Sequence, residues 1–177
     1  MVITLREINL RTFKADDLAF VYAGLSDPDV IQFYGISYST EAACEEQMRW
    51  YQSIEEQGVG CWFLIESAEG KLGALGLNNI CREHHNAELG YWLLPHYWGR
   101  GIMRKALCGL LSYAFNELKL HRIGADVEME NLRSQQLLRT YGFVLEGVSR
   151  ECEIKSGQYV SLMKYSLLKH EFKDITY

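Results

Sequence analysis

The sequence lacks the features that mark membrane proteins, disordered proteins and multidomain chains. Its apolar runs fall well short of the ~20 residues that cross a bilayer. It has only two prolines and no repeat or low-complexity stretch that would form an internal linker. A length of 177 residues is also modest for a globular protein. We therefore expect one domain over residues 1–177 and no membrane partner.

Clusters of basic residues and paired cysteines are also absent. The net charge is −5, and no basic block lies beside stacking aromatics, which argues against a nucleic-acid partner. The five cysteines have neither CxxC nor Cys/His spacing, and the adjacent His84 and His85 face different ways, so no metal site is expected. The N-terminus alternates like a strand rather than a signal peptide. Reduced cysteines then favour a cytoplasmic location.

Apolar periodicity predicts a mixed α/β fold. Alternating apolar residues predict strands at 3–13, 61–66, 71–81, 86–94, 121–127, 143–154 and 158–168. Helical spacing predicts helices at 16–25, 40–57, 103–118 and 132–141. The segment 26–39, with a proline and two tyrosines, is predicted to be a loop.

The first stretch with chemical content is ELGYWLLPHYWGRGIMRKAL, residues 88–107. A strand leads through a turn containing Gly99 and Gly101 directly into a helix. Glycines let backbone N–H groups approach an anion, and a helix N-terminus adds free donors and a positive dipole. Arg100, Arg104 and Lys105 add charge, so the geometry suits a pyrophosphate. The alternative is an ordinary tight turn. A dinucleotide-binding fold is a poor fit because the GxGxxG pattern is absent.

The second stretch is NLRSQQLLRTYGF, residues 131–143. Asn131 and Ser134 lie one helical turn apart, so their side chains point the same way. The alternative is that Asn131 is only an N-cap for the helix that follows.

Together these stretches resemble the GNAT superfamily of acetyltransferases, and within it the RimJ/RimL-like ribosomal-protein N-terminal acetyltransferases. The resemblance covers essentially the whole chain. It depends on WGRG before a helix, N-x-x-S followed by YGF, and Glu146–Gly147 before a terminal hairpin. It implies a mostly antiparallel sheet, splayed between its fourth and fifth strands, with helices on both faces. It also implies acetyl-CoA as co-substrate and no metal.

The resemblance also assigns cofactor contacts. Pantetheine would lie along the backbone of Leu93 and Leu94, and Asn131 would contact the cofactor arm. The residues implied around the pyrophosphate are Trp98, Gly99, Arg100, Gly101, Ile102, Met103 and Arg104. Trp98 and Met103 depart from the general superfamily motif, and both departures are familiar in the RimJ/RimL branch.

For catalysis, the resemblance implies that Ser134 lies near the sulfur and assists the leaving thiolate. Many superfamily members use a tyrosine for this task, at the position that Leu138 occupies here. Glu153 would be the base that removes the amine proton, directly or through water. The alternative for Glu153 is a solvated surface residue, because Glu151 is expected on the same strand face.

Acceptor contacts are expected from the loop 26–39, the start of the helix 40–57 and the turn 155–158. Tyr34 and Tyr38 could line an amine pocket and Asp27 could attract its charge, or the tyrosines could simply pack the loop. The leading function is Nα-acetylation of a protein or peptide N-terminus. Acetylation of a small amine such as a polyamine, aminoglycoside or amino sugar stays open, as does a catalytically silent acyl-CoA-binding module. We expect a monomer or a homodimer.

Overall fold

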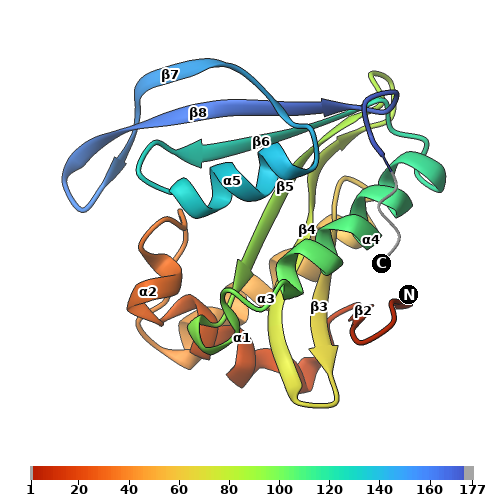
Figure 1. Cartoon of the computed structure of the whole chain (residues 1–177). Helices are drawn as coiled ribbons and strands as arrows, with labels where there is room; N and C mark the ends of the chain where they lie inside the picture. The colour runs from red at the N-terminus through yellow and green to blue at the C-terminus, as the bar shows by residue number, and fades with distance from the viewer. Residues whose placement is uncertain (1, 174–177) are drawn as a thin grey trace.

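The computed structural model describes residues 2–173 and contains one eight-stranded sheet with helices on both faces (Figure 1). The strand order is β1-β2-β3-β4-β5-β6-β8-β7. Every neighbouring pair is antiparallel except β5 and β6, which are parallel. The mixed α/β fold and the mostly antiparallel sheet are therefore confirmed. Within the described residues, no helix is long and apolar enough to cross a membrane.

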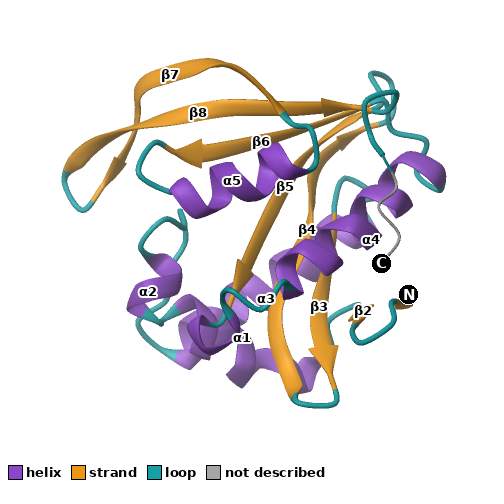
Figure 2. Cartoon of the chain, viewed as in Figure 1, coloured by secondary structure: helices purple, strands orange, loops and turns teal. Residues whose placement is uncertain are grey.

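The secondary structure largely follows the predicted order (Figure 2). The strands are Val2–Thr4 (β1), Asn9–Arg11 (β2), Cys61–Ser67 (β3), Gly70–Cys81 (β4), Asn86–Leu93 (β5), Arg122–Glu128 (β6), Val144–Lys155 (β7) and Gln158–Leu168 (β8). The helices are Leu18–Leu25 (α1), Pro28–Ile31 (α2), Glu41–Glu56 (α3), Ile102–Asn116 (α4) and Leu132–Thr140 (α5). Short 3-10 turns lie at Ala15–Asp17 (η1) and Pro95–Tyr97 (η2).

Two predicted elements differ from the structure. The strand expected at 3–13 is a small hairpin, β1 and β2, in which Val2 pairs with Arg11. The segment expected to be a loop at 26–39 contains α2. The Asp27 carboxylate accepts hydrogen bonds from the N–H groups of Asp29 and Val30, and Pro28 occupies the first helical position. A proline fits there because its missing N–H would have no helical partner.

The two faces of the sheet bury separate cores. Trp62, Ala74 and Trp92 point toward α1 and α3, and their neighbours on the same strands point toward α4. Alternation along each strand produces this division. The contact with α1 is close: a Cβ at Gly24 would lie 2.3 Å from the Trp92 ring, so only glycine fits there. The lack of a side chain at Gly24 therefore allows α1 to pack closely on the sheet at Trp92.

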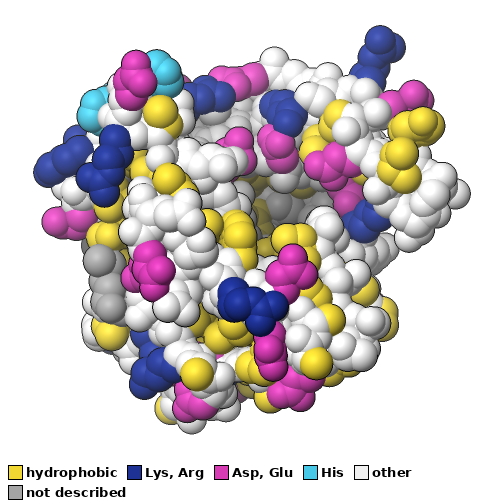
Figure 3. Space-filling model, turned by 180° about the vertical axis from the view of Figure 1, so that it is seen from behind, with side chains coloured by type: hydrophobic (Ala, Val, Ile, Leu, Met, Phe, Trp, Pro, Cys, Tyr) yellow, Lys and Arg dark blue, Asp and Glu magenta, His cyan; other side chains and the backbone are white. Residues whose placement is uncertain are grey.

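The sheet opens between β5 and β6. These strands pair only through Asn86–Arg122, Ala87–Ile123 and Glu88–Gly124, and then diverge, as Figure 1 shows. Among the residues that the structure describes, the rest of β5 thus has no strand partner on its β6 side. Seen from behind, the molecular surface is hollowed where the strands separate (Figure 3). This confirms the predicted splay between the fourth and fifth strands of the expected sheet.

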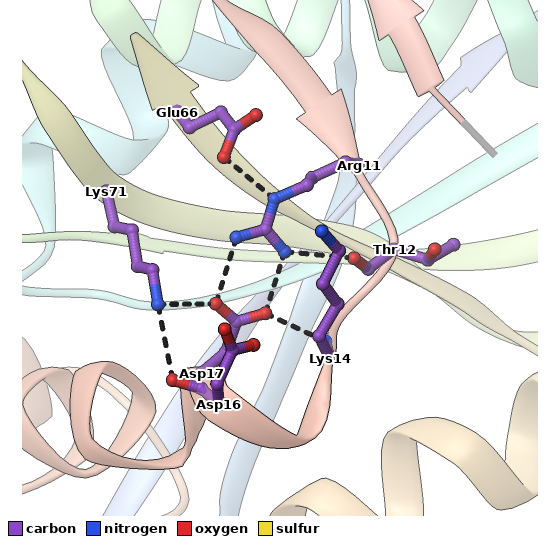
Figure 4. Close-up of polar contacts among 7 residues, drawn as sticks. All are labelled: Arg11, Thr12, Lys14, Asp16, Asp17, Glu66 and Lys71. Carbon is purple, nitrogen blue, oxygen red and sulfur yellow. Dashed lines mark hydrogen bonds and ion pairs between the residues drawn. The ribbon is translucent and has the colours of Figure 1, made fainter. Parts of the chain in front are cut away.

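A buried carboxylate ties the start of α1 to the sheet (Figure 4). Asp17 is fully buried and accepts hydrogen bonds from both terminal nitrogens of Arg11, at 2.7 and 2.9 Å. Lys71 Nζ lies 2.6 Å from Asp17 Oδ1, and Arg11 also binds Glu66 at 2.7 Å. Burial by itself would raise the pKa of Asp17, but the Arg11 and Lys71 contacts outweigh it and hold the pKa well below its usual value. This ion cluster joins η1 to β2, β3 and β4.

Candidate active site

The turn between β5 and α4 contains two exposed glycines, Gly99 and Gly101. Gly99 and Gly101 both have φ = 74°, a left-handed conformation that side chains disfavour. Gly101 is the N-cap of α4, and within residues 2–173 no side chain forms a hydrogen-bonded cap at this end. The first N–H groups of a helix have no intrahelical partner, and the helix dipole is positive there. The turn therefore has the donors and the field that an anion requires.

Trp98 anchors this turn to the strand before it. Its indole N–H donates to the Leu93 carbonyl oxygen at 2.6 Å, and the Arg133 guanidinium lies 4.9 Å from the indole centroid. Arg100 binds the Glu69 carboxylate at 3.0 Å and lies over the Tyr97 ring. The departure of Trp98 from the superfamily motif thus has a structural role.

Some backbone groups at the end of β5 already form hydrogen bonds within the protein. The Leu94 N–H donates to the Leu72 carbonyl oxygen, and the Leu94 carbonyl accepts from the Tyr97 N–H, both at 3.0 Å. The Leu93 carbonyl oxygen already accepts the Trp98 indole N–H. A donor group of a ligand could therefore reach only the second lone pair of the Leu93 oxygen and of the Leu94 oxygen. The contacts of Leu93 and Leu94 with pantetheine stay predictions.

A cavity of about 1140 Å³ extends from this turn past α5 to α2. Most of the predicted site residues line it: Tyr34, Leu93, Trp98, Gly99, Gly101, Ile102, Met103, Arg104, Asn131 and Ser134. Five others do not: Asp27, Tyr38, Leu94, Arg100 and Glu153. The cavity joins the two sequence stretches, residues 88–107 and 131–143, in one space.

Asn131 and Ser134, at the start of α5, make different hydrogen bonds. The Asn131 side-chain oxygen accepts the Ser134 N–H at 3.1 Å, so Asn131 is an N-cap, and its contact with the cofactor arm stays a prediction. The Ser134 hydroxyl lies 2.6 Å from the hydroxyl of Tyr91 on β5. Burial raises the pKa of Tyr91 to about 12, against the opposing effect of the Ser134 hydrogen bond.

Sequence reasoning missed Tyr91. The signal that could have found it is strand alternation, because Tyr91 lies two residues before Leu93 and therefore on the same face of β5. That face is the one that α5 approaches across the cavity. The position of Leu138, where many superfamily members have a tyrosine, is fully buried in the core.

The opposite end of the cavity is formed by α2 and the residues that follow it. Asp29, Val30, Phe33 and Tyr34 line it, and burial raises the pKa of Tyr34 well above its usual value. Asp27, by contrast, caps α2, and the Tyr38 hydroxyl donates to Gln47 Oε1 at 3.1 Å. Tyr34 is thus the predicted acceptor contact that the cavity includes.

The β7–β8 turn reaches across to the same region. Lys155 Nζ binds the Glu128 carboxylate at 2.5 Å and the Gln32 carbonyl oxygen, and it lies 6.0 Å from the Phe33 ring centroid. The predicted acceptor segments 26–39 and 155–158 therefore meet at one side of the cavity.

Glu153 is exposed on β7, the edge strand. A bulge interrupts pairing between Ser149 and Glu153, and within it Glu151 has φ = 51° and its N–H donates to Ser161 Oγ. Simple alternation therefore does not carry Glu151 and Glu153 onto one face. Beyond the bulge, Glu153 shares its face with Lys155, which points to α2 and β6. Its role as base stays a prediction.

Comparison with known proteins agrees with this geometry. Residues 7–144 match the family described as "Acetyltransferase (GNAT) domain". The N-acetyltransferase p20 of Bacillus licheniformis, itself uncharacterised, is 32% identical, over 93% of this chain and 94% of that protein. The spermidine N(1)-acetyltransferase of Escherichia coli K12 is 25% identical, over 93% of this chain and 88% of that protein.

A solved structure has the same fold. RimL, an acetyltransferase of the α-amine of ribosomal protein L7/L12, in complex with coenzyme A, superposes with a TM-score of 0.87. It is 20% identical, and the match covers 95% of this chain and 98% of that one. The fold, the family match and the relatives agree, so the chain belongs to the GNAT family of N-acetyltransferases.

Proposed function

We propose that this protein transfers the acetyl group of acetyl-CoA to the α-amine at the N-terminus of a protein or peptide. The observation that carries the proposal is the single cavity that joins the anion-binding turn at Gly99–Gly101, Ser134 and α2. In this assignment the turn and the start of α4 hold the pyrophosphate, because the first N–H groups of a helix have no intrahelical partner and the helix dipole is positive there. The free edge of β5 accommodates the pantetheine arm.

The reaction needs a neutral amine and a stabilised leaving group. The amine nitrogen attacks the thioester carbonyl carbon, the C–N bond forms, and the C–S electron pair leaves on sulfur. Ser134 donates a hydrogen bond to that sulfur. Glu153 takes the amine proton, directly or through water. An α-amine has a pKa near ~8, so a useful fraction is already neutral at pH 7.5 and a weak base suffices.

The acceptor end of the cavity supports a singly charged amine carried on an apolar chain. Its α2 side has Val30, Phe33, Tyr34 and the Asp29 carboxylate, and a second carboxylate, Glu130, lines the cavity before α5. Asp29 can pair with one ammonium group, and the aromatic rings beside it favour a cation.

A second candidate is acetylation of a small amine. It is favoured by the similarity to the spermidine acetyltransferase of Escherichia coli. In both cases catalysis requires the same thioester chemistry, and only the acceptor differs.

An acceptor screen separates these functions. Acetyl-CoA is incubated with peptides that have free N-termini, the same peptides with blocked N-termini, spermidine and an amino sugar, and release of free thiol is followed. We expect release with the free peptides and none with the blocked ones. Preferred turnover of spermidine or the sugar would replace the first candidate by the second. Tight acetyl-CoA binding without release for any acceptor would identify a silent binding module.

A further inference from the structure

Two hydroxyl groups from different parts of the fold meet inside the cavity. Tyr91 comes from the diverging half of β5 and Ser134 from the first turn of α5, and their oxygens lie 2.6 Å apart. The backbone of Ser134 is held separately, because its N–H donates to Asn131 Oδ1. The serine hydroxyl is therefore the part of the residue whose direction Tyr91 controls.

The number of hydroxyl hydrogen atoms limits which hydrogen bonds Tyr91 and Ser134 can donate. Each hydroxyl has one hydrogen to donate and can also accept. If Tyr91 donates to Ser134 Oγ, the serine hydrogen must point to a third atom. Without the tyrosine, a helical serine commonly donates back to a carbonyl one turn earlier, which would turn its hydrogen away from the cavity.

We propose that Tyr91 is a positioning residue of the transfer reaction: its hydroxyl donates to Ser134 Oγ and so directs the Ser134 hydrogen to the departing CoA sulfur. This inference rests on the proposed function. As the C–S bond breaks, the electron pair on sulfur accepts the Ser134 hydrogen bond, and both hydroxyl groups keep their protons. The thiolate is protonated afterwards by solvent, and the proton lost by the amine goes to the base.

The acidity of the groups favours a hydrogen bond over proton transfer. Burial keeps the pKa of Tyr91 at about 12, whereas an ordinary thiol has a pKa of ~8.5. A proton on the phenol therefore stays on oxygen when a thiolate forms nearby. The pair would act by stabilising negative charge as it develops, which is the contribution that accelerates a reaction.

The test uses coenzyme A alone, so it does not depend on the acceptor. The thiol pKa of bound CoA is titrated by the ultraviolet absorbance of the thiolate in the parent, Tyr91→Phe, Ser134→Ala and the double variant. We expect Tyr91→Phe to weaken the acidity of the bound thiol by on the order of tenfold. In the Ser134→Ala background, the same change should have no further effect, because Tyr91 acts through Ser134.

The kcat values of the four proteins should follow the same coupled pattern, with the KM for acetyl-CoA little changed. Tyr113→Phe on α4 is the matched control, since Tyr113 packs edge-on against Phe63 and does not line the cavity. Thermal unfolding checks that each variant is folded.

Additive effects of the two substitutions, or an unchanged thiol pKa in a folded Tyr91→Phe variant, would overturn the assignment. A protein that shows the coupled thiol shift but acetylates no amine would support the role of Tyr91 and contradict the proposed function. The two hypotheses therefore fail in different ways.

Discussion

The indole N–H of Trp98 donates to the carbonyl oxygen of Leu93, so the glycine turn at Gly99–Gly101 is tied to the strand that precedes it. Trp98→Phe removes this hydrogen bond but keeps a ring beneath Arg133. A neutral hydrogen bond contributes about 1 kcal/mol, so we expect the Kd of acetyl-CoA to rise about fivefold. Isothermal titration calorimetry measures this change, with Trp50→Phe on α3 as the control. An unchanged Kd would mean that the turn keeps its shape without the bond.

Acetyl-CoA should bind a Gly101→Asn variant far more tightly than a Gly101→Asp variant. Both side chains have the same shape and both accept a left-handed conformation better than most residues, so the strain at φ = 74° is similar. Only aspartate places a negative charge against the phosphates. We therefore expect Gly101→Asp to weaken acetyl-CoA binding on the order of tenfold or more beyond Gly101→Asn. Equal affinities of the two folded variants in calorimetry would refute the assignment of this turn to the pyrophosphate.

Ser134→Ala should reduce turnover rather than cofactor affinity. The proposed hydrogen bond to sulfur strengthens only as the C–S bond breaks, so its loss lowers kcat by on the order of 10²-fold. Steady-state kinetics with saturating acceptor give kcat and KM separately. If kcat holds while the KM for acetyl-CoA rises, Ser134 is a cofactor contact or a helix-end residue.

Glu153→Gln should change the pH–rate profile. A base works only when ionised, so activity of the parent falls as the carboxylate protonates on the acidic side. The glutamine variant should be slow at neutral pH and recover partly as pH rises, because more α-amine becomes neutral near pH ~8. For an aliphatic amine of pKa ~10.4 the recovery should be smaller.

Glu151→Gln is a matched control for this experiment, since Glu151 lies in the neighbouring bulge. An identical profile for the parent and Glu153→Gln would leave Glu153 as a surface residue and turn attention to a water chain that carries the amine proton away.

Asp17→Asn should destabilise the fold at neutral pH. The substitution leaves Arg11 and Lys71 without their buried carboxylate, and breaking such a cluster costs about 3 kcal/mol. The pKa of Asp17 is lower in the folded protein than in the unfolded chain. The contribution of the ionised Asp17 carboxylate to the stability of the fold is therefore complete above the unfolded pKa of ~3.9 and is lost as pH falls below that value.

The difference in free energy of unfolding between the parent and Asp17→Asn should accordingly shrink below pH ~4. Urea unfolding at several pH values measures it, and Asp16→Asn, an exposed neighbour, is the control. A constant difference across this range would show that the carboxylate charge is not what stabilises η1.

Local features of this fold were predictable because neighbouring residues determine them. The glycine turn before α4 and the Asn131 cap each depend on a few consecutive residues. The break between β1 and β2 was also encoded, because the apolar alternation of Ile3 and Leu5 changes phase before Ile8 and Leu10. A single strand over 3–13 would need one uninterrupted alternation, so that prediction was wrong.

Other features depend on contacts that no local pattern encodes. The helix α2 has four residues, too few for a helical period to appear. Tyr91 and Ser134 are 43 residues apart in sequence, so their contact exists only after the sheet has splayed and α5 has packed across it. The bulge in β7, which separates Glu151 from the face of Glu153, likewise arises from pairing with β8.

The Lys155 ammonium binds both the Glu128 carboxylate and the Gln32 carbonyl oxygen. One side chain therefore joins the tip of the β7–β8 hairpin to β6 and to the end of α2. Removing its charge would release both segments at once, beside Gln32 and Phe33, which line the cavity at the end where we propose that the acceptor binds.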